Sequence, residues 1–365
     1  MPAPDATRRD GRVHLADLTT LRVGGPAARF IDATTDEAVL DAVRAADASG
    51  TPLLVVGGGS NLVVADEGFP GTVLRIGTTG IESDGDVVRA AAGEDWDGFV
   101  ARMVDEGRAG VETLAGIPGR VGATPVQNVG AYGAEIAQTL LQVLAFDRRA
   151  DRVVVLANED CGFSYRHSVF KGSDRYVVLT VHLSLPVAAQ SCPIRYEELA
   201  RRLGIEVGGS APLADVRAAV LDLRRSKGMV LDAADHDTWS AGSFFTNPVL
   251  TPDQAAALPA EAPRFAAGDR DRGSHVARDG DGDGQLVKTS AAWLIERAGF
   301  GKGYGTGDAR LSTKHTLALT NRGHASTSDI LALAYDIRKE IAVQFGITLA
   351  IEPVVVGGRP GSSSP

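Results

Sequence analysis

One segment limits the possible folds of this chain more than any other. Residues 110–135 are rich in glycine, proline and alanine and carry few charged side chains. Such a stretch buries little apolar surface by itself, so it is not expected to form a regular helix or a core strand. We expect its backbone to wrap a large planar or phosphorylated ligand, with Gln127 and Asn128 supplying amide donors and acceptors. The alternative is an irregular connection, which the length and low charge of the segment make less favoured.

A second glycine-rich loop lies between two apolar runs. Residues 57–61 read Gly-Gly-Gly-Ser-Asn, and strands are expected on either side at 52–56 and 62–64. Glycines let backbone N–H groups approach a phosphate closely, and Ser60 and Asn61 add donors. A strand follows where a dinucleotide fingerprint needs a helix, and no Gly-Lys-Ser/Thr closes a P-loop. Taken alone, the pattern is at least as typical of a tight strand-to-strand turn.

Length and composition indicate a folded chain of two or three domains. The chain has 365 residues, 44% hydrophobic and 23% charged, which is typical of globular proteins. The net charge of −9, with no basic run longer than residues 224–227, argues against a general nucleic-acid binder. Only Cys161 and Cys192 are present, so neither a disulfide scaffold nor a paired-cysteine zinc site is expected. Neither a signal peptide nor a membrane-spanning run of about 18 apolar residues is found, which favours the cytoplasm.

Periodic patterns predict the regular elements, and helix caps are expected at Thr34 with Glu37, at Asp95, and at Ser326 with Asp329. The expected helices cover residues 34–50, 95–107, 196–204, 216–227, 289–299 and 326–346, and further strands are expected at 176–185 and 354–356. Strand 176–185 alternates cleanly and is expected to be half-buried. Residues 260–285 have almost no large apolar side chains and are expected to be an exposed or disordered insertion. Their 279–284 portion imitates the start of a calcium loop, but Ser290 stands where the bidentate glutamate belongs, so no metal site is expected.

Three positions outside the glycine-rich segments could carry chemistry. Arg166 lies among aromatic residues, a setting suited to carboxylate recognition, although a surface arginine stacked on Tyr165 would give the same pattern. Ser243 lies between Gly242 and two phenylalanines, as an isolated hydroxyl in a dry pocket or a buried serine bonded to backbone. Glu352 is either paired, kept protonated by its apolar surroundings, or a strand-end glutamate facing water. No G-x-S-x-G elbow supports a hydrolase triad.

Together these segments resemble the UDP-N-acetylenolpyruvoylglucosamine reductase (MurB) family of peptidoglycan synthesis. The resemblance extends from residue 20 to residue 353. Six segments follow the family's order: 57–61, 117–133, 165–171, 242–248, 291–302 and 345–353. One segment would be weak evidence, whereas six in order are specific. The segment that starts at Tyr196 resembles the family's type I form, which keeps a tyrosine loop over the substrate.

The resemblance implies an α+β fold. A two-part FAD-binding domain of the vanillyl-alcohol-oxidase (PCMH) type would be joined to a C-terminal α/β substrate-binding domain. The implied boundaries are 1–75 and 76–190 for the FAD-binding subdomains, 205–350 for the substrate-binding domain, and 351–365 for a closing strand and flexible tail. Non-covalent FAD, NADPH as reductant and an enolpyruvyl ether of UDP-N-acetylglucosamine as substrate are implied as well. The product would be UDP-N-acetylmuramate, which serves cell-wall formation, cell shape and division.

The resemblance also implies roles for individual residues. Arg166 and Glu352 resemble the family pair that stabilises an enolate-like intermediate, and Ser243 resembles the proton donor. The implied FAD contacts are Gly57, Gly58, Gly59, Ser60, Asn61, Pro118, Gly119, Gly122, Ala123, Gln127, Asn128, Gly130 and Ala131. The implied contacts to the UDP-sugar are Tyr165, Tyr196, Lys227, Asn247 and His315.

Rival interpretations come from other classes of protein. A flavoprotein oxidase of the same fold often carries a covalent histidine link, and residues 57–61 contain no histidine. A non-catalytic UDP-sugar-binding protein would not be yellow, and nothing in the sequence favours a cell-division scaffold. We expect a monomer that acts on a small-molecule substrate without a nucleic-acid or membrane partner.

Overall fold

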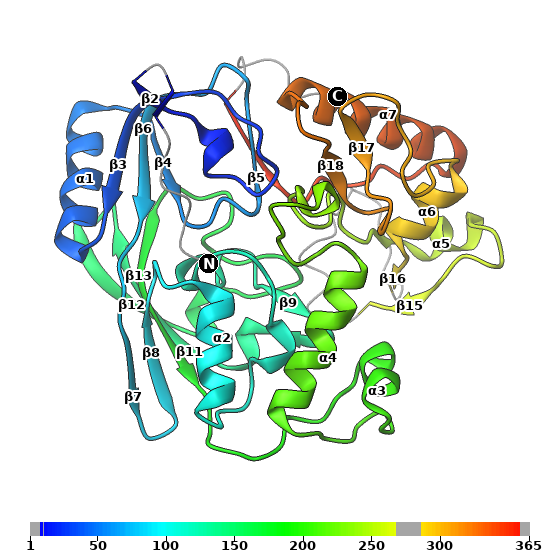
Figure 1. Cartoon of the computed structure of the whole chain (residues 1–365), viewed down its shortest axis with the longest axis horizontal. Helices are drawn as coiled ribbons and strands as arrows, with labels where there is room; N and C mark the ends of the chain where they lie inside the picture. Colours follow the sequence, from blue (N-terminus) through cyan, green and yellow to red (C-terminus); the bar gives the residue numbers. More distant parts are fainter. Residues whose placement is uncertain (1–7, 10, 268–285, 358–365) are drawn as a thin grey trace. The chain divides into compact units, whose positions relative to one another are not determined.

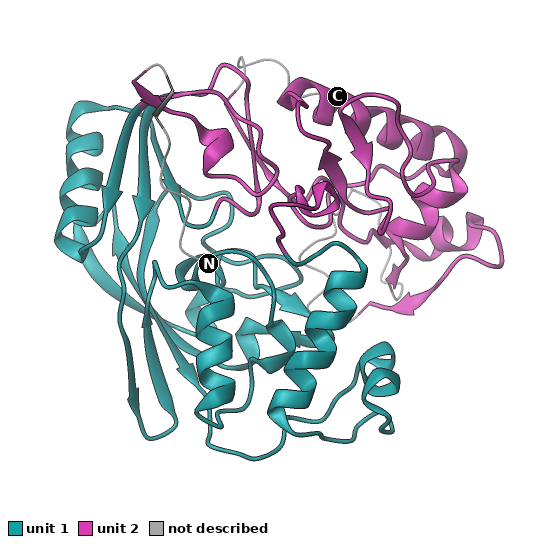
Figure 2. Ribbon diagram, in the orientation of Figure 1, with its two compact units in different colours: residues 1–3, 29–58, 71–230 teal, residues 4–28, 59–70, 231–365 magenta. Residues whose placement is uncertain are grey.

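The chain folds into two compact units, each made of several separate segments. The computed structural model describes residues 8–9, 11–267 and 286–357 (Figure 1). Unit 1 comprises residues 1–3, 29–58 and 71–230, and unit 2 comprises residues 4–28, 59–70 and 231–365 (Figure 2). One passage of the chain from unit 1 to unit 2 falls between Gly58 and Gly59, inside the glycine-rich loop. The calcium-like portion 279–284 lies outside the described residues.

A three-stranded sheet and one helix form the first part of unit 1. The sheet has the order β3-β6-β4, with β3 at Ala27–Ala33, β6 at Phe69–Ile76 and β4 at Leu53–Val56. Helix α1 (Asp36–Ser49) begins at Thr35, whose hydroxyl accepts a hydrogen bond from the Ala38 N–H at 3.2 Å. It ends at Gly50, where φ is +62°. The predicted cap, Thr34, is therefore wrong by one residue, because the Thr35 side chain is the one that accepts.

A five-stranded antiparallel sheet forms the second part of unit 1. Its order is β12-β11-β13-β8-β7, with bounds Arg152–Ala157, Leu140–Asp147, Tyr176–Ser184, Val87–Ala91 and Ile81–Asp84. The predicted half-buried character of the strand at 176–185 holds at its ends, where Tyr176, His182 and Ser184 are part-exposed, and is wrong in its middle. There Val178 and Thr180 on one face are about as buried as Val177 and Val181 on the other. Both faces of the middle of β13 therefore contribute to the core of unit 1.

The glycine-rich segment 110–135 lies in unit 1 among three helices. It contains short helical turns at Glu112–Leu114 and Val121–Ala123 and a small strand pair, β9 (Gly130–Ala131) with β10 (Ala134–Glu135). The helices are α2 (Trp96–Asp105), α3 (Glu197–Leu203) and α4 (Leu213–Ser226). Asp95 caps α2 as predicted, and the α2 residue Trp96 donates its indole N–H to the Leu114 carbonyl at 3.1 Å. Contrary to expectation, the segment contributes buried side chains to the core, including Val111, Leu114 and Val121.

Unit 2 has its own core around helix α7 (Thr327–Phe345). The predicted capping box of Ser326 and Asp329 is present, and Gly346 ends the helix at a φ of +67°. The predicted closing strand is β19 (Val354–Val356), which pairs in parallel with β5 (Leu62–Val64). The other elements are β1 (Arg8–Arg9), β2 (Arg12–Val13), β14 (Val249–Leu250), α5 (Pro252–Ala257), β15 (Phe265–Ala266), β16 (Val287–Lys288), α6 (Ala291–Arg297), β17 (Ala309–Leu311) and β18 (Leu319–Asn321).

The first part of the predicted insertion is ordered. Residues 260–267 contain β15, which pairs with β16. The Arg264 guanidinium donates to five backbone carbonyls after and within α5, including those of Ala255 and Leu258 at 3.0 and 2.9 Å. Most of residues 260–267 are exposed, as expected, but the segment is ordered, because the exposed Arg264 fork of donors ties it to the backbone in and after α5. In the described part of the chain, no helix has the length and apolarity needed to cross a membrane.

Candidate functional site

The two glycine-rich segments meet by backbone contact within unit 1. A Cβ atom at Gly58 would lie 2.7 Å from the Gly119 Cα, and one at Gly57 would lie 3.2 Å from the Arg120 Cβ. These approaches leave no room for a side chain, which explains the glycines there. Sequence reasoning placed both segments at one ligand, and the structure places residues 57–58 against residue 119.

The loop after β4 has free backbone donors. The N–H groups of Gly58, Gly59 and Ser60 donate no hydrogen bond to any residue within 8–9, 11–267 and 286–357. Successive unpaired amides in a glycine turn form an anion-binding site, because they offer several donors without a buried lysine. The residues present therefore fit a diphosphate group such as that of FAD. In the described ranges, no group of three or more potential metal ligands is found.

The side chain of Asn128 forms its hydrogen bonds within the protein. It is completely buried with a φ of +48°, and its amide nitrogen donates to the Glu135 carboxylate at 3.0 Å and to the Ser164 carbonyl at 3.1 Å. Its side-chain oxygen accepts from the Ala137 N–H at 3.1 Å. The side chain thus ties three loops of unit 1 together. A role of Asn128 toward a cofactor stays a prediction, and it would rest mainly on the backbone.

Arg166 is seated on the same loop. Its guanidinium donates to the Gly130 carbonyl at 2.8 Å and to the Asn128 carbonyl at 3.4 Å, and lies 5.4 Å from the centre of the Tyr165 ring. Its φ of +53° is uncommon for a residue with a side chain, and Lys171 fixes the backbone there by donating to the Arg166 carbonyl at 2.9 Å. Unit 1 therefore aims a fixed cation at the end of the glycine-rich segment.

The predicted substrate residues Tyr196 and Lys227 lie together in unit 1, around Tyr132. The Tyr196 ring meets the Tyr132 ring edge-on with centroids 5.4 Å apart, and the Lys227 ammonium lies 6.0 Å from the Tyr132 centroid. Burial raises the pKa of Tyr132 to about 12, so this phenol stays neutral. Lys227 forms an ion pair of 2.6 Å with Glu198. Burial lowers the pKa of Arg224 to about 10, which leaves a second cation in the cluster at neutral pH.

A cavity of about 260 Å³ adjoins this cluster. It is lined by residues 110, 112–113, 132–134, 138–139 and 192–195, and the last of these segments leads into Tyr196. Cys192 on its wall is a free thiol, as is the buried Cys161. The cavity places Tyr132 and the residues before Tyr196 around one space in unit 1.

A short antiparallel ladder in unit 2 joins the segment that carries Ser243 to the segment that carries Glu352. Phe245 and Ile351 form the bridge, and the Glu352 N–H donates to the Phe244 carbonyl at 3.0 Å. The rings of Phe244 and Phe245, which follow Ser243, are buried in the core of unit 2 and lie 5.5 Å apart. In this ladder register Glu352 pairs with Phe244, and Ser243 stands one position further along the facing segment.

His315 and Asn247 lie beside this ladder in unit 2. The Phe244 N–H donates to the Leu317 carbonyl at 2.7 Å, so the turn that carries His315 is attached next to Ser243. Two ion-paired aspartates hold that turn, since Lys314 contacts Asp235 at 2.5 Å and the Thr313 N–H donates to Asp237 at 2.9 Å. Asn247 uses its side-chain oxygen to accept the N–H of Ala291 at the start of α6 at 3.0 Å.

Sequence reasoning missed three residues around these sites. Tyr132 and Glu198 contact the predicted substrate residues, and Thr20 contacts the loops before Ser243 and Asn61. The sequence contained a hint of each residue. Tyr132 lies near the end of the glycine-rich segment, Glu198 follows Tyr196 at the start of the same helix, and Thr20 begins the stretch at which the resemblance begins.

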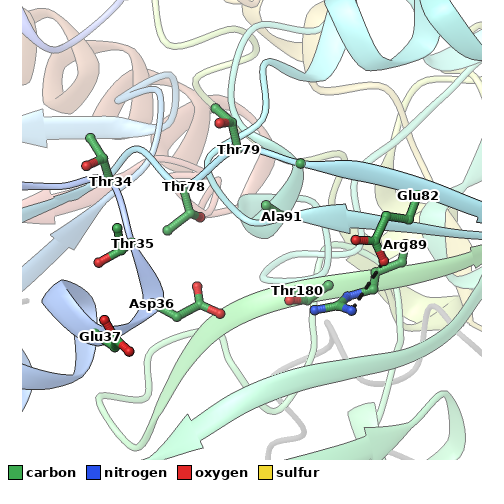
Figure 3. Close-up of a pocket in the computed structure, with 11 residues that line it drawn as sticks. Thr34, Thr35, Asp36, Glu37, Thr78, Thr79, Glu82, Arg89, Ala91 and Thr180 are labelled. Carbon is green, nitrogen blue, oxygen red and sulfur yellow. Dashed lines mark hydrogen bonds and ion pairs between the residues drawn. The ribbon is translucent and has the colours of Figure 1, made fainter.

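A separate polar cavity of about 360 Å³ lies elsewhere in unit 1 (Figure 3). Its walls are rich in threonine, and Glu82 and Arg89 on them are paired at 3.4 Å. None of the predicted site residues lines it. It therefore plays no part in the candidate site.

Comparisons with known proteins cover nearly the whole chain. A family model described as FAD binding domain matches residues 27–155, and one described as the C-terminal domain of UDP-N-acetylenolpyruvoylglucosamine reductase matches residues 234–356. The UDP-N-acetylenolpyruvoylglucosamine reductase of Thermobifida fusca is 59% identical over 350 residues, which cover 94% of this chain and 97% of the relative. That of Streptomyces avermitilis is 57% identical over 345 residues, with 94% and 93% covered.

One solved structure matches along almost its full length. The crystal structure of UDP-N-acetylenolpyruvylglucosamine reductase (MurB) from Thermus caldophilus is 27% identical, with a TM-score of 0.65, and the match covers 95% of this chain and 98% of that one. The predicted fold class, an FAD-binding domain followed by a distinct C-terminal domain with mixed helices and strands, is confirmed.

Proposed function

The chain belongs to the UDP-N-acetylenolpyruvoylglucosamine reductase family, and from this premise we propose that it reduces the enolpyruvyl ether of UDP-N-acetylglucosamine to UDP-N-acetylmuramate with NADPH. Family membership confirms the predicted flavoenzyme with an FAD-binding domain. The observation that supports the proposed chemistry is the ladder that joins the segments of Ser243 and Glu352, in which the Glu352 N–H donates to the Phe244 carbonyl. A hydroxyl and a carboxyl group on paired segments suit a reaction that ends in protonation of an enolate carbon.

FAD, when bound, takes up hydride from NADPH and supplies it to the vinyl carbon of the substrate. The residues proposed to hold it non-covalently include the free amides at residues 58–60, and the backbone of residues 118–119, 122–123, 127–128 and 130–131. The closeness of residues 57–58 to residue 119 supports one shared site for these two loops. All of these contacts are proposals from the family pattern.

Arg166 and Glu352 are proposed to stabilise the substrate carboxylate as negative charge builds beside it. Arg166 suits this role because its guanidinium is held by two backbone carbonyls and presents a planar fork of donors that matches a carboxylate. Glu352 can stabilise an enolate oxygen only in its protonated form, in which its O–H donates. Its backbone N–H is fixed to the Phe244 carbonyl, which limits the positions open to its carboxyl group.

Ser243 is proposed to give its hydroxyl proton to the enolate carbon. A hydroxyl is a weak acid, so the transfer needs a strongly basic carbon and a dry, fixed geometry. Gly242, at a φ of +72°, turns the chain directly before Ser243, and the buried pair Phe244 and Phe245 follows. Tyr165, Tyr196, Lys227, Asn247 and His315 are proposed to contact the UDP-sugar, with Lys227 meeting phosphate. We further propose that the enzyme is a cytoplasmic monomer.

Separate half-reactions test this function. The purified protein should be yellow, lose its flavin absorbance with NADPH under anaerobic conditions, and regain it on addition of the enolpyruvyl substrate. In Ser243→Ala, bleaching should stay near the wild-type rate, while reoxidation by the substrate should slow by about 10²–10⁴-fold. Ser326→Ala, which removes the cap of α7 in unit 2, serves as the control and should leave both rates near wild type. Wild-type reoxidation in Ser243→Ala would make Ser243 a packing residue.

A further inference from the structure

The hydroxyl of Thr20 links two functional loops of unit 2. Thr20 is buried, and its Oγ1 lies 2.7 Å from the Ser240 carbonyl and 3.4 Å from the Ser60 carbonyl. Its backbone N–H donates to the Gly59 carbonyl at 3.3 Å. One residue therefore holds the unit 2 end of the glycine-rich loop with its backbone and the chain before Ser243 with its side chain.

The link continues from Ser240 to Ser243 in two short steps. The Ser240 Oγ accepts a hydrogen bond from the Gly242 N–H at 3.3 Å, and Gly242 directly precedes Ser243. Because Gly242 has no side chain and a φ of +72°, this turn has little rigidity of its own. The bonds of Phe244 hold the chain after Ser243, so the position of the turn before Ser243 depends on the bonds at Ser240.

Other contacts keep the two segments together without the Thr20 hydroxyl. The Arg22 guanidinium lies 3.8 Å from the centre of the Trp239 ring, and the Asn321 amide donates to the Leu21 carbonyl at 3.2 Å. The Asn321 N–H donates to the Trp239 carbonyl at 3.0 Å. Loss of one hydroxyl should thus leave unit 2 folded while the Ser240 carbonyl loses its donor.

We propose that Thr20 is a positioning residue that keeps the proton-donating turn at Ser243 in fixed register with residues 59–60 of the cofactor loop. The inference rests on the proposed function, in which Ser243 is the donor. Proton transfer from a weak acid depends steeply on the distance to carbon, so a small displacement of the turn is costly. Hydride delivery depends on the cofactor loop, and protonation depends on Ser243. The Thr20 hydroxyl connects the cofactor loop directly to the chain before Ser243.

Thr20→Val tests the link because valine keeps the shape and removes the hydroxyl. Thr19 supplies a matched control, since it is equally buried and its hydroxyl donates to the Val23 carbonyl at 3.0 Å and to neither loop. Thr20→Val should slow reoxidation by the enolpyruvyl substrate at least tenfold and weaken FAD binding about threefold or more. Thr19→Val should change both by less than twofold at a similar loss of melting temperature, and Thr20→Ser should restore most of the reoxidation rate.

A readout on the FAD-free protein completes the test. Amide hydrogen exchange at residues 242–244 should quicken in Thr20→Val and remain unchanged in Thr19→Val. Should Thr20→Val fail to fold, Ser240→Ala interrupts the same link one step later and should reproduce the slow reoxidation. Equal rates, FAD affinities and exchange in the two threonine variants would overturn the proposal. If wild-type protein does not reduce the enolpyruvyl substrate at all, the proposed function fails, while exchange and FAD affinity still decide whether Thr20 joins the two loops.

Discussion

Gly59 offers a direct test of the cofactor loop, because a second glycine of the chain has the same backbone conformation but lies outside the candidate site. Gly59 has a φ of +60°, and Gly50, at the end of α1, has a φ of +62°. A Cβ at Gly50 would meet nothing within 4 Å, whereas one at Gly59 would overlap the Leu18 carbonyl, 2.8 Å from its carbon and 3.0 Å from the Thr19 Cα. A comparison of alanine at the two positions therefore separates the cost of a left-handed alanine from the cost of the steric overlap.

The expected magnitudes follow from these contacts. A left-handed alanine costs about 1–2 kcal/mol at either position. At position 59 the obstructing atoms are backbone and cannot rotate away, so the loop must move, at an additional cost of about 1–3 kcal/mol. The movement also strains the bond from the Thr20 N–H to the Gly59 carbonyl. FAD binding must then restore the wild-type position of the loop, and because about 1.4 kcal/mol is tenfold in affinity, Gly59→Ala should weaken FAD binding by about 5- to 150-fold.

A flavin titration measures this effect. FAD is first removed from wild type, Gly59→Ala and Gly50→Ala, and rebinding is followed by the quenching of flavin fluorescence. Gly50→Ala should bind FAD within twofold of wild type, although its melting temperature falls as well. If Gly59→Ala binds FAD as tightly as Gly50→Ala does, the loop that carries the free amides does not hold the cofactor.

Two further predictions concern binding of the substrate and resistance to acid. Tyr196→Phe and Lys227→Ala should raise the KM for the UDP-sugar several-fold and leave flavin reduction at saturating NADPH near wild type. Arg202→Ala, which breaks another ion pair between α3 and α4, at 2.7 Å to Asp222, should leave that KM unchanged. The hydrogen bond from Arg175 lowers the pKa of Asp147 to about 2, below the value of about 3.9 in an unfolded chain. This carboxylate therefore stabilises the fold above pH 4, and the stabilisation is lost as the pH falls toward 2. Arg175→Leu should therefore remove stability at pH 7 and flatten the decline of the melting temperature between pH 4 and pH 2, as measured by circular dichroism, and an unchanged acid profile would contradict the assigned cause.

Local signals predicted the elements whose ends are fixed by one or two residues. Gly50, Gly204 and Gly346 each end a helix in the left-handed conformation, and only the backbone near that residue decides this. The cap at Asp95 and the box at Ser326 are equally local. Strands β7, β8, β11 and β12 were not predicted, and neither was the order of the large sheet. Their pairing depends on partners far along the chain, which no local pattern specifies.

The candidate site could likewise be predicted only in part from local sequence signals. Its residue types could be proposed from short motifs, but the ladder that joins the segments of Ser243 and Glu352 pairs residues more than 100 positions apart in the chain. Asn128 shows the limit of a motif, because an amide in a glycine-rich loop suggested a ligand contact, while its side chain bonds to three other parts of unit 1 and ties its loops together. Asparagine tolerates a positive φ, so the same residue serves the backbone of that loop.

The distribution of backbone hydrogen bonds explains why the site needs so few charged side chains. A buried carbonyl or N–H must find a partner, and the two units use this requirement in opposite ways. In unit 1, the carbonyls of Asn128 and Gly130 accept the Arg166 guanidinium, so the loop orients a cation. In unit 2, the carbonyl of Ser240 is occupied by Thr20, so the turn before Ser243 is fixed. The amides of residues 58–60 have no such partner in the described part of the chain, and they are the donors that remain for an anionic ligand.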